Sequence, residues 1–182
     1  MESGYHSEQW FELDPLFARP EQLQPFVAEL AQRLVAHRID AVCGPMTGGA
    51  KLARLVADDL GLDYFFTERF EPPTAVTGLF PVNYRVPAGQ REKLAGRRVA
   101  IVDDAISAGS AVRGTHADVT DCGGQTVAIG ALFIFGDAAD GFTKERGLAL
   151  EGIVRMCFGM WPPAECPLCR AGIKLGKVSA AV

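Results

Sequence analysis

The 182-residue sequence predicts a single α/β domain built on a mostly parallel sheet. Three apolar runs of strand length, at residues 39–43, 99–102 and 126–135, are separated by stretches of helical periodicity. Strands that alternate with helices along a chain favour a parallel sheet covered by helices. A chain of this size buries about 70% of its unfolded surface, so a hydrophobic core alone can hold it together.

The remaining elements follow from periodicity and from turn residues. Apolar residues at helical spacing predict a helix over 21–38, and Gly123-Gly124 ends another that starts at residue 109. Residues 70–89 contain four prolines and little periodicity, which predicts a lid loop with a strand arm at 79–86. The other expected elements are a helix over 50–60, strands over 62–69 and 151–158, a short half-buried strand over 10–14, and a turn over 136–141.

Composition restricts the classes of partner. The net charge is −4 and no Lys/Arg run is long enough to follow a nucleic-acid backbone, so we expect no nucleic-acid partner. The sequence has no apolar run of membrane-spanning length, so we expect no membrane partner either. Five cysteines in a chain with a full core predict free thiols and a cytoplasmic location.

The cysteine pair of the tail allows two interpretations. Cys166 and Cys169 have the spacing of half a zinc site, but no second pair accompanies them. We therefore favour two free or oxidisable thiols over a metal site. His6, in the N-terminal segment, is interpreted as a hydrogen-bonded surface histidine rather than a ligand.

Residues 99–112 carry the strongest functional pattern. An apolar strand runs into Asp103 and Asp104, and a turn of small residues, Ser107 to Ser110, then leads into a helix. Backbone N–H groups of such a turn, the helix start and the serine hydroxyls together favour a phosphate. The carboxylates beside them can accept hydrogen bonds from vicinal hydroxyls, so the unit predicts a sugar-phosphate site.

A second strand–loop–helix unit precedes it. The loop Gly44-Pro45-Met46-Thr47-Gly48-Gly49 follows the strand at 39–43, and its glycines let backbone N–H groups converge on an anion. Arg69, at the end of the strand over 62–69, is a guanidinium suited to bidentate phosphate contacts. A surface Arg69 paired with Glu68 or Glu71 is an equally good interpretation of that residue.

These motifs resemble type I phosphoribosyltransferases, and the orotate phosphoribosyltransferases most closely. The resemblance extends to Ser3-Gly4-Tyr5-His6-Ser7 and to the tail Cys166-Pro167-Leu168-Cys169. It implies the type I core, a small hood from residues 1–20 and possibly the tail 160–182, and a lid at 70–89. The implied reaction transfers 5-phosphoribose from phosphoribosyl pyrophosphate (PRPP) to a nitrogenous base, with orotate leading, and releases pyrophosphate.

The resemblance also implies roles for individual residues. Asp103 and Asp104 would be catalytic, and a non-proline cis peptide would fall near Met46-Thr47. Mg²⁺ would be bound mainly through PRPP, with no metal site built from protein alone, and the protein would be a homodimer. The implied PRPP-binding residues are Met46, Thr47, Gly48, Gly49, Arg69, Asp103, Asp104, Ala105, Ile106, Ser107, Ala108, Gly109, Ser110 and Ala111, and the implied base-binding residues are Trp10, Phe11 and Ser107.

Several positions depart from the family pattern and keep other functions open. The lid has no lysine, and Arg85 is the only cation from residue 70 through residue 88. Glu2 and Tyr5 stand where the family often has a Lys for the orotate carboxylate, and Asp137 stands where some members have an Arg for the orotate ring. The alternatives are a PRPP-binding regulator without transferase activity, a phosphoribosyltransferase for another base and, more distantly, a phosphohydrolase using the two aspartates as metal ligands.

Overall fold

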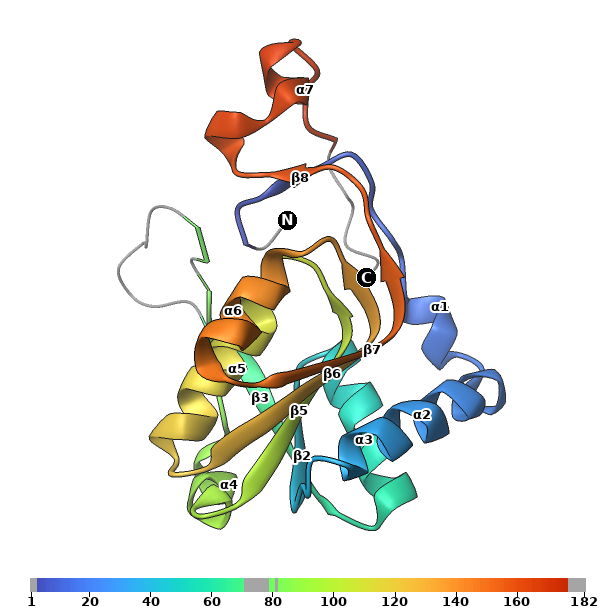
Figure 1. Cartoon of the computed structure of the whole chain (residues 1–182), viewed down its shortest axis with the longest axis vertical. Coiled ribbons are helices and arrows are strands. Elements are labelled where there is room, and N and C mark those ends of the chain that lie inside the picture. Colours follow the sequence, from blue (N-terminus) through green and yellow to red (C-terminus); the bar gives the residue numbers. More distant parts are fainter. Residues whose placement is uncertain (1–2, 71–78, 81, 177–182) are drawn as a thin grey trace.

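A computed structural model describes residues 3–70, 79–80 and 82–176, and its centre is a six-stranded sheet (Figure 1). The strand order is β4-β3-β2-β5-β6-β7, with every pair parallel except the antiparallel edge pair β3–β4. The strands are β2 (Ala41–Pro45), β3 (Asp63–Phe70), β4 (Asn83–Arg85), β5 (Arg98–Ile106), β6 (Gln125–Phe135) and β7 (Ala149–Met156). The predicted mostly parallel α/β fold is confirmed.

Helices cover both faces of the sheet. One core joins α2 (Pro20–Val35) and α3 (Gly48–Leu60) to one face, through residues such as Leu30 and Leu52. The opposite face packs against α5 (Ser110–Asp121) and α6 (Ala138–Arg146). The short elements α4 (Ala88–Arg91) and η1 (Glu92–Leu94) lead from β4 into β5.

The central strand β5 is apolar because both of its faces are covered. Ala100 and Val102 lie in the α2–α3 core, whereas Val99 and Ile101 lie in the cores on the other side. Two flanking parallel strands satisfy its backbone, so the run can hold only side chains that pack without polar partners. This is why the sequence pattern located the strand that positions the site.

Two expected elements are wrong. Residues 10–13 form no strand, and the helix α1 (Asp14–Phe17) begins where the expected strand was to end. The expected turn over 136–141 holds the start of α6 instead, with Asp137 in the N-cap position. In both places a short segment takes its conformation from tertiary packing, which local alternation and turn propensity do not encode.

A hood lies at one end of the sheet and joins the two ends of the described chain (Figure 1). The strand β1 (His6–Ser7) pairs antiparallel with β8 (Met160–Trp161), and η2 (Pro163–Glu165) and α7 (Pro167–Arg170) complete the tail. A hood made from both the N-terminal stretch and the tail fits the expectation. Glu2, most of the lid (71–78 and 81) and residues 177–182 lie outside the described residues.

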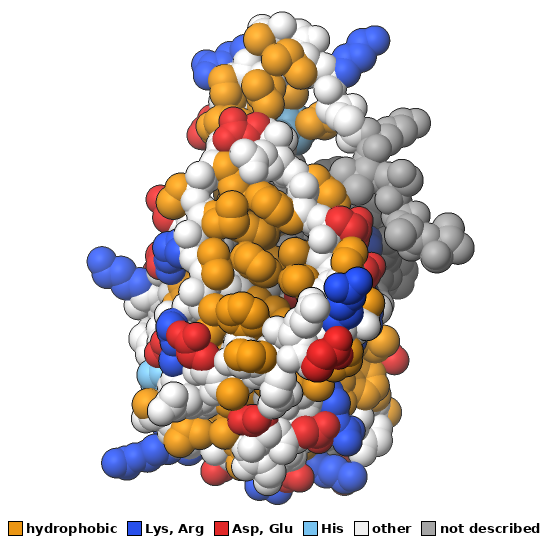
Figure 2. All heavy atoms as spheres, turned by 90° about the vertical axis from the view of Figure 1, so that its right-hand side faces the viewer, with side chains coloured by type: hydrophobic (Ala, Val, Ile, Leu, Met, Phe, Trp, Pro, Cys, Tyr) orange, Lys and Arg blue, Asp and Glu red, His pale blue; other side chains and the backbone are white. Residues whose placement is uncertain are grey.

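The surface beside α1, α2 and the hood is rich in hydrophobic side chains. Figure 2 shows them gathered along the middle of this face, with charged side chains at its margins. Exposed apolar residues include Phe26 and Val35 on α2 and Val154 on β7. Among the helices that the structure describes, none is long and apolar enough to cross a membrane.

Candidate active site

A cleft of about 390 Å³ opens at the carboxyl ends of β2 and β5, beneath the hood. Open parallel sheets place ligands at this edge because the strand-to-helix loops converge there. The cleft brings together all but one of the residues predicted for PRPP and base. Its lining includes Trp10, Phe11, Met46, Thr47, Gly48, Gly49 and the continuous run Asp103 to Ala111, whereas Arg69 is not part of it.

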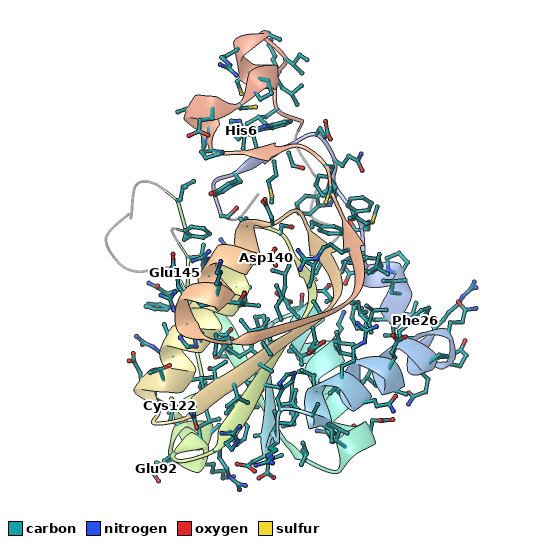
Figure 3. All side chains as sticks on the ribbon, in the orientation of Figure 1. His6, Phe26, Glu92, Cys122, Asp140 and Glu145 are labelled. Atoms are coloured by element: carbon teal, nitrogen blue, oxygen red, sulfur yellow. The ribbon has the colours of Figure 1, made fainter. Side chains whose placement is uncertain are left out.

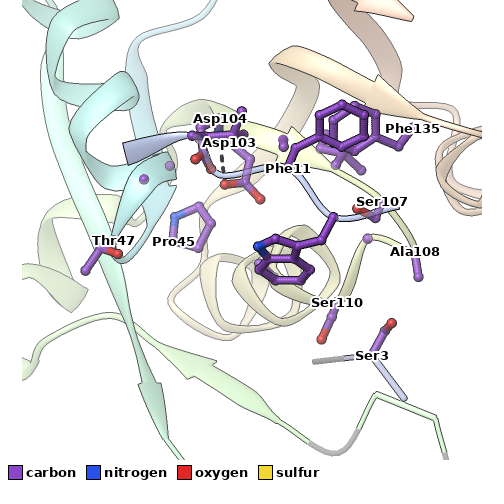
Figure 4. Close-up of a pocket in the computed structure, with 18 of the residues that line it drawn as sticks. Ser3, Phe11, Pro45, Thr47, Asp103, Asp104, Ser107, Ala108, Ser110 and Phe135 are labelled. Atoms are coloured by element: carbon purple, nitrogen blue, oxygen red, sulfur yellow. Dashed lines mark hydrogen bonds between the residues drawn. The ribbon is translucent and has the colours of Figure 1, made fainter. Parts of the chain in front are cut away.

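The two aspartates face the glycine loop. Asp103 is 7% exposed, and its Oδ1 accepts a hydrogen bond from the backbone N–H of Asp104 at 3.0 Å (Figure 4). A Cβ at Gly48 would lie 2.2 Å from Oδ2 of Asp104, and one at Gly49 would lie 2.5 Å from Oδ1 of Asp103. A side chain at either position would displace a carboxylate, and one at Gly49 would also meet the ring of Pro45.

The same contact shows how the two sequence motifs form one site. The glycine loop is the link between β2 and α3, and its helix begins at Gly48. Met46 donates its backbone N–H to the carbonyl of Thr67 at 2.8 Å, and the Met46–Thr47 peptide is cis, as expected. The carboxylates and the backbone of a potential anion loop thus meet within one wall of the cleft.

The start of α5 forms the second polar wall. Gly109 occupies its N-cap with φ of 80°, a left-handed conformation that favours glycine. The next residue, Ser110, is 9% exposed, and its Oγ is buried without a hydrogen-bond partner. A buried hydroxyl without a partner at a helix N-terminus, beside backbone N–H groups, is suited to an anionic ligand.

Aromatic side chains line the opposite end of the cleft. Phe11 stacks on Phe135 with ring centroids 4.8 Å apart and planes inclined by 18°, and it leans on Phe158 at 5.5 Å. Figure 4 shows Phe11 and Phe135 on the other side of the aspartates from Thr47. Trp10, 55% exposed, also lines the cleft. Such surfaces suit a flat heterocycle, as the sequence predicted for Trp10 and Phe11.

The lining residues that sequence analysis missed include three aromatic ones, Tyr84, Phe135 and Phe158. Phe135 ends β6, and its position at the carboxyl edge of the predicted sheet was the one available signal. Tyr84 lies at the cleft because β4 pairs antiparallel with β3, and this pairing places Tyr84 opposite Arg69. Arg69 itself is exposed and is the last residue but one of β3, outside the cleft lining.

Beneath the site, polar and thiol groups are structural. The hydroxyls of Thr67 and Thr115 hydrogen-bond at 2.7 Å and tie β3 to α5 in the interior. Cys43 on β2 is fully buried, and this burial, followed by the nearby Cys122 and Asp118, raises the pKa of its thiol. The Cys43 thiol stays protonated and serves as core rather than as a nucleophile.

The side-chain charges that line the cleft are all negative among the described residues. Glu12 and Asp14 join the two site aspartates in the lining, and none of the described lining residues is Lys or Arg. Arg85, the cation of the lid, stacks over the ring of Phe70 at 4.4 Å. Phe80 donates its backbone N–H to the carbonyl of Ser3 at 3.0 Å, so this end of the lid contacts the hood.

Comparisons of the sequence with a family model and with known proteins agree on the family to which the chain is similar. A family model described as phosphoribosyl transferase domain matches residues 21–153. The orotate phosphoribosyltransferase of Caldanaerobacter subterraneus subsp. tengcongensis is 30% identical over 177 residues, which cover 97% of this chain and 85% of the relative. That of Thermotoga maritima is 27% identical, with 97% of this chain and 87% of the relative covered.

Solved structures share the fold. Adenine phosphoribosyltransferase from Thermoanaerobacter pseudethanolicus superposes with a TM-score of 0.65 at 19% identity, covering 81% of this chain and 88% of that one. Orotate phosphoribosyltransferase from Aeropyrum pernix gives a TM-score of 0.61 at 18% identity, with coverages of 81% and 78%. Because enzymes for different bases share this fold, the structural likeness alone does not select a base.

Proposed function

Because this chain belongs to the phosphoribosyltransferase family, we propose that it transfers 5-phosphoribose from PRPP to orotate and releases pyrophosphate. The observation that carries the proposal is the meeting of the Asp103–Asp104 pair with the Gly48–Gly49 loop in one cleft. The relatives named for orotate align over nearly the whole chain, hood included, which supports orotate as the acceptor. The proposed role lies in pyrimidine nucleotide synthesis, and a cytoplasmic location remains a prediction from the cysteines.

The reaction breaks the bond between C1 of the ribose and pyrophosphate, and forms one between C1 and a ring nitrogen of the base. That nitrogen gives up its proton, and the pyrophosphate leaves with the electron pair of the broken bond. C1 gains positive charge on the way, and the carboxylates of Asp103 and Asp104 stabilise it while accepting hydrogen bonds from the ribose hydroxyls.

The two backbone-rich walls hold the phosphates. We assign the 5′-phosphate to the N–H groups of residues 107–111 and to the buried hydroxyl of Ser110. We assign the pyrophosphate to the loop from Met46 to Gly49, with Arg69 at the rim. Anchoring both ends fixes C1 against the base, which lies against Phe11 and Trp10.

Mg²⁺ fits the donor chemistry of this site. Hard cations take oxygen ligands, and Asp103 and Asp104 offer carboxylate oxygens in the lining of the cleft. We expect the ion to be held mainly by PRPP oxygens, with these two aspartates within reach. When bound, it would neutralise charge on the leaving pyrophosphate.

Turnover with PRPP and a panel of bases tests the function. Orotate, uracil, adenine and hypoxanthine are offered separately with Mg²⁺, while pyrophosphate release and the nucleotide product are measured. We expect product from orotate, and much slower product formation by the Asp103→Asn/Asp104→Asn variant. Tight PRPP binding without pyrophosphate from any base would instead identify a regulatory PRPP-binding protein.

One observation favours a second candidate function, in which the acceptor is a base other than orotate. The described residues that line the cleft include no Lys or Arg to meet the orotate carboxylate. A phosphoribosyltransferase for an uncharged base needs no such cation. In the same assay, product from a neutral base in preference to orotate would select this function.

We also propose that the protein works as a homodimer in which the lid of one chain reaches the site of the other. The one-sided charge of the cleft supports a cation supplied from outside it, and exposed apolar side chains such as Phe26 and Val35 provide surface to bury. The proposal therefore rests on the acidic lining of the cleft and on the exposed apolar surface.

Subunit mixing tests the shared site. Asp103→Asn/Asp104→Asn protein and Arg85→Ala protein are each expected to have little activity. Unfolding and refolding them together should restore part of the activity, because a mixed dimer would hold one intact site. Heterodimers without any recovered activity would show that each chain builds its site alone, and a monomer by light scattering would end the proposal.

A further inference from the structure

The hood brings three metal-ligating side chains together from opposite ends of the chain. The Nδ1 of His6 lies 3.2 Å from the Sγ of Cys169, and ligand atoms of His6, Cys166 and Cys169 all lie within 4.8 Å of one another. In Figure 3, His6 lies beside the tail, between β8 and α7. More than 150 residues separate His6 from the cysteines, which is why the sequence did not show the cluster.

We propose that His6, Cys166 and Cys169 bind one Zn²⁺ and that this ion fastens the tail to the N-terminal segment. Two thiolates and an imidazole favour a soft or borderline metal over Mg²⁺ or Ca²⁺. Tetrahedral zinc with its usual bond lengths places sulfur and nitrogen ligands about 3.5 Å apart, and two sulfurs about 3.8 Å apart. The observed cluster needs only small shifts of these side chains to reach that geometry.

The local backbone presents both sulfurs to one point. Cys166 is the N-cap residue of α7 and is 1% exposed, and Cys169 lies three residues later within that helix. Side chains three residues apart on a helix are neighbours, so both sulfurs can reach one ion. On binding, the two thiols would release their protons to solvent, and a water would complete four ligands.

The hood has few buried side chains to hold it together. Among the described residues of 3–20 and 157–176, only Ser3 and Cys166 are buried, so this lobe has no hydrophobic core of its own. Its ends are joined by the short β1–β8 ladder and by polar contacts such as Gly159 N–H to Glu8 Oε1 at 2.7 Å. Small units without a core are commonly held by a structural metal, which here would lie between β1 and α7.

Cobalt substitution tests the site without using enzymatic activity. Reduced full-length protein is stripped of metal and titrated with Co²⁺, and tetrahedral ligand-field bands and thiolate-to-cobalt charge transfer are followed. We expect one equivalent to bind and Zn²⁺ to displace it. Cys166→Ser and Cys169→Ser should lose the charge-transfer band or bind far more weakly, and His6→Gln should weaken binding and shift the ligand-field bands.

The control is Cys157→Ser, which removes an exposed thiol of the same segment outside the cluster and should leave the titration unchanged. Because a ligand variant could unfold the hood, the zinc X-ray absorption spectrum of the wild type provides an independent measurement and should show two sulfur ligands. A titration without thiolate charge transfer would overturn the proposal. So would a Cys166–Cys169 disulfide without zinc in protein isolated anaerobically, which would identify a redox pair instead.

Discussion

The loops over 46–49 and 107–111, here called the phosphate wall, and the hood lie on opposite sides of one cleft. The two regions are built in different ways. The phosphate wall is made of two continuous strand–loop–helix units, whose loops contact the ligand site mainly with backbone and small residues. The hood is assembled from segments at the two ends of the described chain and presents aromatic side chains. Ligand binding at the phosphate wall should therefore be lost when bulk is added to its loops. Binding at the hood should be weakened when an aromatic side chain is removed.

The largest effect is expected from Gly109→Val. Its φ of 80° disfavours a β-branched residue, and the added bulk would enter the phosphate wall at the start of α5. We expect PRPP binding to be lost in calorimetric titration while the circular dichroism spectrum stays native. Gly123→Val is the matched control, since φ there is 79° but the residue is not part of the cleft lining. If both variants bind PRPP equally, residues 107–111 are not the phosphate site.

Removing the charge of the two aspartates should give the next largest effect. Asp103→Asn/Asp104→Asn keeps the shape of the wall, so PRPP should still bind. Turnover should fall by about 10²–10³-fold, because interactions with developing charge act mainly in the transition state. Asp121→Asn, at the exposed far end of α5, is the control. Equal losses in turnover and PRPP affinity would show that the aspartates only hold the ribose.

The hood should respond to Phe11→Ala in a different parameter. Loss of one aromatic contact corresponds to about 1 kcal/mol, or roughly five- to tenfold, and we expect it in the KM for the base. The dissociation constant for PRPP should remain near the wild-type value, because Phe11 lies at the aromatic end of the cleft. Ile173→Ala, at an exposed position of the tail outside the cleft lining, serves as control. A change confined to PRPP affinity would place the base elsewhere.

The difference between the two regions also explains what the sequence could predict. Residues 99–112 encode strand, acids, turn and helix in one uninterrupted order, so β5, its aspartates and the start of α5 were all predictable. The glycine loop could be placed beside them because parallel strands end at a common edge. Phe135 and Phe158 lie at the site because they pack against Phe11. His6 lies beside Cys169 because β1 pairs with β8. Such long-range contacts leave no local periodicity to detect.

The smallest effect, and the finest test of the phosphate wall, is expected from Ser110→Ala. Its Oγ is buried without a partner, so its removal takes away a polar group that folding leaves unsatisfied. The free energy of unfolding should therefore stay equal or rise slightly, while PRPP affinity falls by a few-fold as the ligand loses one donor. Thr126→Val is the matched control, because Thr126 Oγ1 is also buried without a partner but lies on β6 outside the cleft lining. Thermal unfolding and calorimetric titration of both variants should show similar stability changes and a loss of affinity in Ser110→Ala alone. Unchanged affinity in both would mean that backbone N–H groups hold the phosphate without this hydroxyl.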